Sequence, residues 1–208
     1  LSKILNIKGK VIPSTNTNVM LNAVLEDGEI VEGESKIPKK NKKIRRVYLE
    51  PSNVEPMQEA VDALQEADLI VLGPGSLYTS VISNLCIEGI SKAIISSQAP
   101  KLYISNIMTQ PGETNDYDVY DHIKAIHQHA GEPFIDYVIC SNDAFDEQIL
   151  QRYKERNAHP VNMNKIKLTE NNIKMITSKN LVEIYDHVFV RHNTKVLAKL
   201  VYDLALEL

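Results

Sequence analysis

The sequence predicts an α/β fold with a doubly wound, mostly parallel sheet and an antiparallel hairpin portion. After residue 51, helical patterns alternate with short segments that are apolar on both sides, as in parallel strands covered by helices. Before residue 51, apolar and polar residues alternate around an Asp-Gly pair, as in a hairpin. A single domain over residues 1–208 is the simplest organisation, because no linker, repeat or low-complexity tract interrupts the chain.

The first 50 residues contain the antiparallel portion. Residues 19–25 and 29–37 flank the Asp-Gly pair and predict a hairpin, and residues 44–51 predict another strand of the same type. Residues 1–7 resemble the last turns of a helix, and the first residue is not methionine. We therefore expect the chain to be a fragment.

The middle of the chain contains the predicted parallel sheet. Residues 54–67 predict a helix, because apolar residues from Val54 to Leu64 recur on one helical face. The elements that follow alternate in type: strand 68–73, helix 80–97, strand 101–105, helix 117–130, strand 136–141 and helix 143–155.

The last third is less regular. Residues 172–178 and 186–191 predict strands. Residues 193–208 predict an amphipathic closing helix with Asn193 as its N-cap. Its apolar face consists of Val196, Leu200, Val201 and Leu204.

Composition excludes several classes of protein. The 208 residues, 43% of them hydrophobic, are enough to bury a sizeable core. A net charge of −4 argues against a nucleic-acid binder, and the apolar runs are far shorter than the roughly 20 residues that span a bilayer. Cys86 and Cys140 lie far apart within apolar runs, which predicts free buried thiols and a cytoplasmic location.

One local exception to the acidic balance is the run from residue 36 to residue 46, with seven basic residues in eleven. Such a run is typical of a solvated connection between strands. A docking patch for an acidic partner is the alternative. The run has no interleaved aromatic residues, so it does not predict an RNA site.

Ligands of open α/β sheets bind outside the carboxyl ends of the strands, so the loops after the strands are the places to search. After the first parallel strand, Gly73 and Gly75 remove side chains around Pro74, and the amides from Ser76 onward begin a helix that favours anions. With the hydroxyl of Thr79 nearby, a phosphate fits this loop. A tight strand-to-helix turn is the alternative explanation, because the loop matches neither dinucleotide nor P-loop motifs.

The loop after the next strand, residues 106–116, is also polar. Asn106, Thr109 and Gln110 lie before a Pro-Gly turn and offer donors and acceptors that suit a base edge or sugar hydroxyls. Residues 141–143 follow the third strand and are more typical of a helix N-cap.

Arg191 ends the last predicted strand, directly before the closing helix. Its planar fork suits a diphosphate, and a surface salt bridge is the alternative.

Signs of catalysis or metal binding are weak. The histidines at 122, 127 and 129 share one predicted helix, but their spacing does not place them on a common face, so they predict no helical zinc site. We expect His122 to be a satisfied, semi-buried residue. No nucleophile motif is present, so we predict no catalytic and no metal-ligating residue.

Three segments of the sequence closely resemble the CofD-like family, and specifically its branch of YvcK-type gluconeogenesis factors. These segments are VIPSTNTNVMLNAVLEDGEIVEGESKI, ADLIVLGPGSLYTSVISNL and NIMTQPGETNDYDVYDHIKAI. The resemblance implies a Rossmann-like fold whose glycine-rich loops bind a UDP-sugar. It also implies a cytoplasmic regulator needed for growth on gluconeogenic carbon, cell-wall synthesis and cell shape, with no separate cofactor and no nucleic-acid or membrane partner.

Carried over by position, the resemblance predicts ligand-facing residues in three segments: Gly73, Pro74, Gly75, Ser76, Leu77, Thr79, Asn106, Thr109, Gln110 and Arg191. Arg191 lies in RHNT, similar to the family's Arg-His-Asp-Thr, with Asn193 in place of the acidic residue. Family members open with a strand and a glycine-rich phosphate loop that this sequence lacks, so we expect part of the ligand site to be absent.

Two other functions stay open. The related CofD branch transfers a phospholactyl group to a deazaflavin precursor, so a transferase is the alternative to a non-catalytic regulator. A binding module that has lost its ligand is the third reading. A homo-oligomer is also left open.

Overall fold

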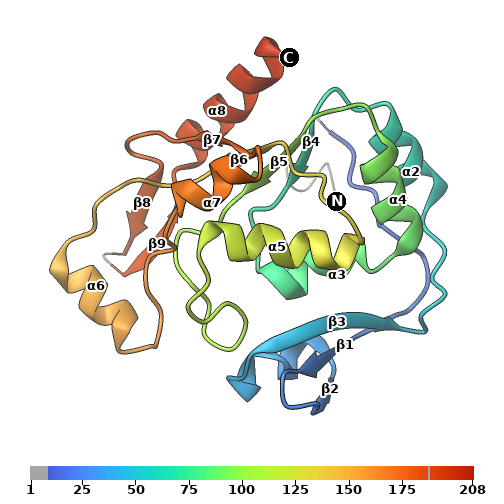
Figure 1. The fold of residues 1–208 in the computed structure, drawn as a ribbon, viewed down its shortest axis with the longest axis horizontal. Helices are drawn as coiled ribbons and strands as arrows, with labels where there is room; N and C mark the ends of the chain where they lie inside the picture. Colours follow the sequence, from blue (N-terminus) through green and yellow to red (C-terminus); the bar gives the residue numbers. More distant parts are fainter. Residues whose placement is uncertain (1–8, 187) are drawn as a thin grey trace.

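The computed structural model describes residues 9–186 and 188–208 (Figure 1). The helix expected at residues 1–7 lies outside the described residues. The described chain forms a four-stranded parallel sheet, a three-stranded antiparallel sheet and a two-stranded hairpin. The predicted α/β class, with a parallel sheet and an antiparallel portion, is confirmed.

The parallel sheet has the strand order β4-β5-β6-β7, and each strand pairs in parallel with the next. Its strands are β4 (Ile70–Leu72), β5 (Lys101–Ile104), β6 (Tyr137–Ile139) and β7 (Lys174–Ile176). All four were predicted from the sequence, and β4 and β7 form the two edges.

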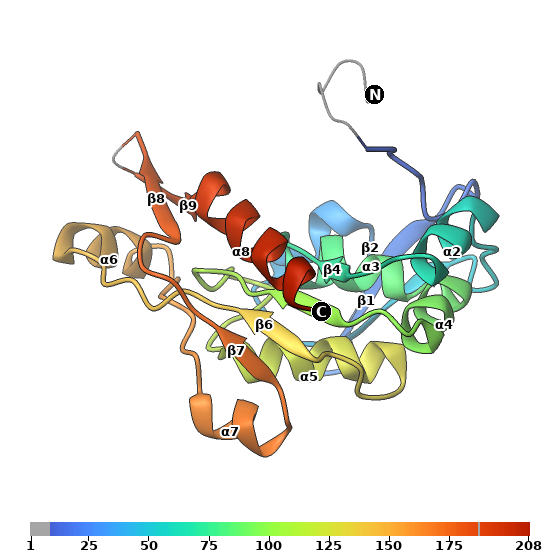
Figure 2. The same cartoon turned by 90° about the horizontal axis from the view of Figure 1, so that it is seen from above.

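Helices cover both faces of this sheet. Along β5, Tyr103 packs into the larger core with residues of α5 (Val119–Ala130), whereas Leu102 and Ile104 pack with residues of α8 (Thr194–Glu207). Figure 2 shows α5 and α8 on opposite sides of the sheet. All four residues of β5 are buried, as expected of a central parallel strand.

The closing helix begins as predicted. The side-chain oxygen of Asn193 accepts hydrogen bonds from the backbone N–H groups of Lys195 and Val196, both at 3.2 Å. The predicted apolar face packs on the sheet, and Leu197 joins it.

The helix predicted at residues 80–97 is instead two helical segments. A π-helical turn, Leu77–Ile82, starts directly after the glycine loop and continues into α3 (Ser83–Leu85). The chain then breaks, and α4 (Glu88–Ser96) packs against α2 (Gln58–Gln65). The break separates the part of the helix that lies near the glycine loop from the part that packs on α2.

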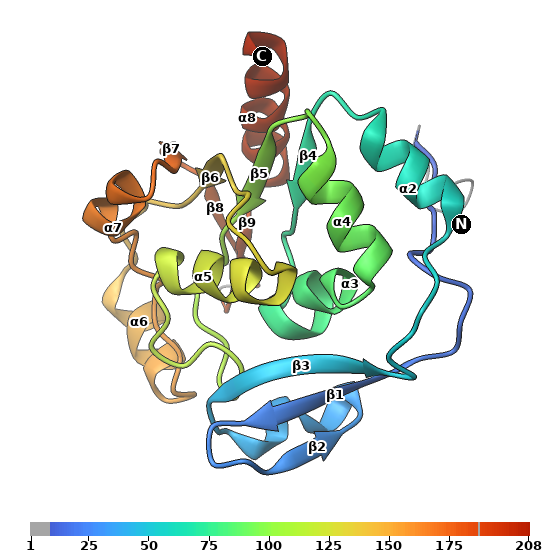
Figure 3. The same ribbon diagram turned by 45° about the vertical axis from the view of Figure 1, so that its right-hand side comes forward.

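The antiparallel sheet lies beside the parallel-sheet body, as Figure 3 shows. Its order is β2-β1-β3, and its strands are β1 (Met20–Leu25), β2 (Ile30–Glu32) and β3 (Ile44–Glu50). The second strand ends five residues earlier than predicted, because Gly33 turns the chain with a φ of +92°. Two 3-10 turns follow, Glu34–Lys36 and Pro38–Lys40.

The basic run at residues 36–46 is partly neutralised by this sheet. Lys42 pairs with Asp27 at 2.7 Å and with Glu29 at 2.8 Å, and Lys40 pairs with Glu29 at 2.5 Å. The basic side chains of the run are exposed. A solvated connection therefore accounts for the run, and the docking patch stays a prediction.

Two elements were not predicted from the sequence. These are α7 (Lys165–Glu170) and β8 (Val182–Tyr185), which pairs antiparallel with β9 (Phe189–His192). The β8–β9 hairpin matters for the site because it places Arg191 next to the start of α8.

Residues 141–143 do not cap a helix as expected. The following helix, α6 (Glu147–Lys154), is capped by Asp146. The carboxylate of Asp143 instead accepts hydrogen bonds from the backbone N–H groups of Asn180 at 2.8 Å and Val182 at 3.0 Å. Asp143 therefore anchors the start of β8.

Candidate functional site

Two adjoining cavities open beyond the carboxyl ends of β4 and β5. The first, which we name the Arg191 pocket, has a volume of about 610 Å³. It is lined by Pro74, Gly75, Ser76, Asn106, Ile107, Met108, Thr109, Gln110, Tyr153, Tyr185, Val190, Arg191, His192, Thr194 and Leu197.

The second cavity, which we name the Arg156 pocket, has a volume of about 810 Å³. It is lined by Glu34, Ser35, Pro38, Ser76, Thr79, Thr109, Gln110, Pro111, Glu113, Tyr153, Arg156 and Ala158. Four residues line both pockets, namely Ser76, Thr109, Gln110 and Tyr153. The two pockets therefore form one continuous crevice.

The structure brings most of the predicted site residues together. Seven of the ten line the Arg191 pocket: Pro74, Gly75, Ser76, Asn106, Thr109, Gln110 and Arg191. Thr79 lines the Arg156 pocket, and Gly73 lines a different cavity. Leu77 is fully buried in the core, so its side chain does not face the crevice.

The two loop glycines are explained by packing inside the protein. A Cβ on Gly73, whose φ is +87°, would lie 3.1 Å from the carbonyl oxygen of Ile104 on β5. A Cβ on Gly75 would lie 3.1 Å from the Cβ of Ser80. The glycines thus let the loop pack closely on its neighbours, which needs no bound ligand.

The start of the π-helical turn is already occupied by a carboxylate of the protein. Glu113 accepts hydrogen bonds from the backbone N–H of Tyr78 and from the hydroxyl of Thr79, both at 3.2 Å. Glu113 is only 5% exposed, and this burial raises the pKa of its carboxyl group. A phosphate at that helix end, as expected from the sequence, would therefore have to displace Glu113.

Side chains of the second loop hold the two loops side by side. The amide nitrogen of Asn106 donates to the carbonyl oxygen of Gly75 at 3.0 Å, and that of Gln110 donates to the hydroxyl of Ser76 at 2.9 Å. The side-chain oxygen of Gln110 is buried and has no hydrogen-bond partner in the described part of the chain. Because the atom is almost wholly shielded by protein, it does not face either pocket in this conformation.

Arg191 is exposed and lines its pocket from strand β9. Its guanidinium carbon lies 5.6 Å from the centre of the Phe189 ring, and one of its nitrogens donates to the carbonyl oxygen of Val190 at 3.1 Å. Glu183 pairs with Arg191 across the hairpin, but its carboxylate accepts from the hydroxyl of Tyr185. No described carboxylate forms an ion pair with Arg191, so the salt-bridge alternative is not supported.

Several residues of the crevice were missed in the sequence. Tyr153 and Arg156 lie on and just after α6, Tyr185 lies on β8, and Glu34 and Ser35 lie in a 3-10 turn. None of them lies in a loop directly after a strand of the parallel sheet, where ligand-binding residues were expected. The 3-10 turn with Glu34 and Ser35 has no sequence motif that predicts a ligand site.

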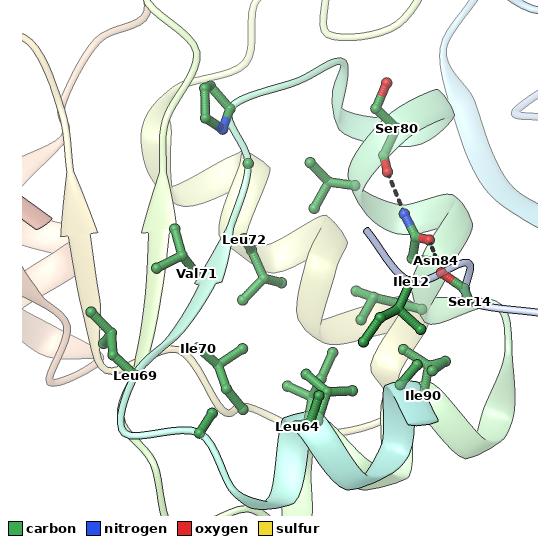
Figure 4. A pocket seen from close by; sticks show the side chains of 18 of the residues that line it. Ile12, Ser14, Leu64, Leu69, Ile70, Val71, Leu72, Ser80, Asn84 and Ile90 are labelled. Atoms are coloured by element: carbon green, nitrogen blue, oxygen red, sulfur yellow. Dashed lines mark hydrogen bonds between the residues drawn. The ribbon is translucent and has the colours of Figure 1, made fainter. Parts of the chain in front are cut away.

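A third cavity, of about 700 Å³, lies on the other side of the glycine loop (Figure 4). Figure 4 shows the apolar side chains of Leu64, Ile70, Leu72 and Ile90 around it, beside the edge strand β4. The valine at position 71 is 38% exposed at this edge. None of the polar loop residues 106–110 lines this cavity, which shares only Pro74 with the described lining of the Arg191 pocket.

The histidines of α5 are structural. His129 accepts a hydrogen bond from the backbone N–H of Val47 at 3.0 Å, and His127 accepts from those of Phe134 and Ile135. His122 is fully buried rather than semi-buried, and its Nε2 has no partner among the described residues. In the part of the chain that the structure describes, no group of His, Cys, Asp or Glu residues is arranged to hold a metal ion.

These histidines predict a loss of stability in mild acid. Burial lowers the pKa of His122 and His129, and it lowers the pKa of His127 to about 4. Below about pH 6.5 the unfolded chain therefore binds protons that the folded protein does not, so the free energy of unfolding falls as the pH drops from 6.5 toward 4. Burial raises the pKa of Glu113 and opposes this loss only in part. Urea midpoints measured across this pH range test the prediction.

His127→Gln provides the matched variant for this test. The glutamine carbonyl still accepts from the two backbone N–H groups but does not titrate, so its midpoint should depend less steeply on pH. Identical slopes for both proteins would show that His127 does not contribute.

Comparison with known proteins identifies the family. A family model described as 2-phospho-L-lactate transferase CofD matches residues 1–181. The chain belongs to the CofD family. The resemblance found in the sequence is thereby confirmed.

Relatives of this CofD family member include gluconeogenesis factors. The chain is 41% identical over 207 residues to that of Bacillus subtilis (strain 168), covering 100% of the chain and 65% of the relative. It is 40% identical over 203 residues to that of Halalkalibacterium halodurans, covering 98% and 62%. The chain thus spans less than two thirds of the length of these relatives.

A solved structure supports the same assignment. The crystal structure of a Bacillus halodurans protein described as a member of the UPF0052 family matches with a TM-score of 0.89 and 41% sequence identity. The match covers 97% of this chain and 64% of that one. Among the described residues, no helix combines the length and apolar character needed to cross a membrane.

Proposed function

We propose that this CofD family member is a regulatory protein of the gluconeogenesis-factor type that binds a UDP-sugar such as UDP-N-acetylglucosamine. On this proposal it acts in the cytoplasm, links carbon metabolism to cell-wall synthesis and cell shape, and needs no separate cofactor. The Arg191 pocket carries the proposal, because its chemistry suits a nucleoside diphosphate.

Three features of the Arg191 pocket favour a diphosphate. The guanidinium of Arg191 has no carboxylate partner among the described residues, and its fork suits two phosphate oxygens. The amino end of the 14-residue helix α8 borders the pocket at Thr194 and adds a partial positive charge. None of the described residues that line this pocket is an aspartate or a glutamate, and the nearby Glu183 accepts from the hydroxyl of Tyr185.

The same pocket offers surfaces for the rest of a nucleotide. Tyr153 and Tyr185 line it, and Tyr185 is 44% exposed, so its ring face is free to stack on a base.

A CofD-type transferase is the second candidate, because the family model that matches the chain is described by that activity. Such an enzyme would bind a deazaflavin precursor. The two candidates therefore differ in the ligand that the crevice prefers.

Titration calorimetry of the full-length protein with UDP-N-acetylglucosamine, NAD and a deazaflavin tests the proposal. We expect the UDP-sugar to bind at least about tenfold more tightly than the other two compounds, a difference of about 1.4 kcal/mol. A preference for the deazaflavin would favour the transferase instead.

A further inference from the structure

The two pockets of the crevice differ in charge. Among the described residues, no acidic residue lines the Arg191 pocket, whereas Glu34 and Glu113 both line the Arg156 pocket. A carboxylate repels a phosphate but accepts hydrogen bonds from neutral hydroxyl groups. The crevice therefore has one end that suits an anion and another that suits a neutral polyol.

The Arg156 pocket is also rich in neutral hydrogen-bonding groups. Residues with hydroxyl groups line it from three separate loops or turns, namely Ser35, Ser76, Thr79 and Thr109; the hydroxyl of Thr79 donates to Glu113, and that of Thr109 accepts from the backbone N–H of His159. Side chains of this kind read the hydroxyl pattern of a sugar by direct hydrogen bonds. At about 810 Å³, the pocket is larger than the Arg191 pocket, at about 610 Å³.

The residues at the junction between the two pockets are mostly polar. Ser76 and Gln110 line both pockets and are hydrogen-bonded to each other at 2.9 Å. The unpartnered oxygen of Gln110 is buried at this junction. A ligand with its diphosphate at Arg191 would pass Ser76 and Gln110 before it entered the second pocket.

Arg156 is the distinctive side chain of the second pocket. It lies just beyond the end of α6, is exposed, and has no ion-pair partner among the described residues. Its five N–H donors complement the exposed carboxylate of Glu34, so the pocket can both donate to sugar oxygens and accept from sugar hydroxyl groups.

We propose that the Arg156 pocket is the hexose subsite of this protein and that Arg156 contributes to recognition of the sugar. This inference rests on the proposed function, because it assumes that the crevice binds a nucleotide sugar. It assigns the diphosphate and base to the Arg191 pocket and the hexose to the Arg156 pocket.

A comparison of UDP with UDP-N-acetylglucosamine separates the two subsites. Arg156→Ala in the full-length protein should weaken binding of the UDP-sugar about tenfold and leave the affinity for UDP within about twofold, because UDP has no hexose. Lys154→Ala is the matched control, since Lys154 is exposed at the end of α6, two residues before Arg156, and lines neither pocket.

A second variant tests the pocket by filling it. Ser35 is exposed and its hydroxyl forms no hydrogen bond in the described structure, so Ser35→Trp should fold and block the pocket. It should weaken UDP-sugar binding and spare UDP binding.

Each outcome decides a different question. Equal loss of UDP and UDP-sugar affinity in Arg156→Ala would place the nucleotide in this pocket and overturn the assignment. No change in either affinity for both variants would place the pocket outside the ligand and also overturn it. If the wild type bound neither compound, the proposed function itself would fail before the variants were considered.

Discussion

Arg191→Ala is expected to weaken binding of UDP-N-acetylglucosamine by roughly 10- to 150-fold. A charge-assisted, two-pronged contact to a diphosphate contributes about 1.5 to 3 kcal/mol, which corresponds to this range. Arg191→Glu should bind more weakly still, because it replaces the guanidinium by a charge that repels a diphosphate. Titration calorimetry on the full-length protein measures both effects.

Folding must be followed in the same variants. Because no described carboxylate forms an ion pair with Arg191, the urea midpoint should change by less than the equivalent of about 1 kcal/mol. Lys199→Ala is a suitable control, since Lys199 lies on the following helix α8, pairs with Asp203 at 2.6 Å and does not line the pocket. Unchanged affinity in both Arg191 variants would remove this residue from the site.

Gly112→Ala is expected to destabilise the protein by roughly 2 to 5 kcal/mol, through a strained φ and an overpacked contact. The φ of Gly112 is +83°, and an added Cβ would lie 2.0 Å from the carbonyl oxygen of Pro38. The contact is with backbone, so relief requires the 3-10 turn Pro38–Lys40 to move away. Pro38 and the neighbouring Glu113 both line the Arg156 pocket, so UDP-sugar affinity should fall as well.

Gly131→Ala separates the effect of backbone strain from the effect of the overpacked contact. Gly131 also has a positive φ, at +98°, but an added Cβ there would meet no atom within 4 Å. It should therefore cost only the backbone strain, about 1 kcal/mol. Urea denaturation of both variants tests this prediction. Equal losses in the free energy of unfolding would show that the contact between Gly112 and the backbone of Pro38 adds nothing to the cost of backbone strain.

The parallel sheet could be predicted because its strands are apolar on both faces. The segment at β5 is buried on every residue, and this produces a run that stands out between helical patterns. The short strand β8 has no such signal, since it has three exposed residues among its four and is held by the distant Asp143. The break after α3 was missed because residues 80–97 are apolar on both sides of it.

The candidate site could be predicted only in part. The rule that ligands bind at strand ends found Ser76, Asn106 and Gln110, which the structure places in one crevice. It could not find Glu34 and Arg156, because the antiparallel portion and the end of α6 reach the crevice only through tertiary packing. The chemistry of the glycine loop was also hidden, since Glu113, which caps its helix, lies 35 residues away from Tyr78.

A crystal structure of the full-length protein with UDP-N-acetylglucosamine tests the central claim most directly. We expect phosphate oxygens about 3 Å from the guanidinium nitrogens of Arg191, with Glu113 still accepting from Tyr78 and Thr79. A diphosphate bound at the backbone N–H of Tyr78, with Glu113 displaced and no contact to Arg191, would contradict the account.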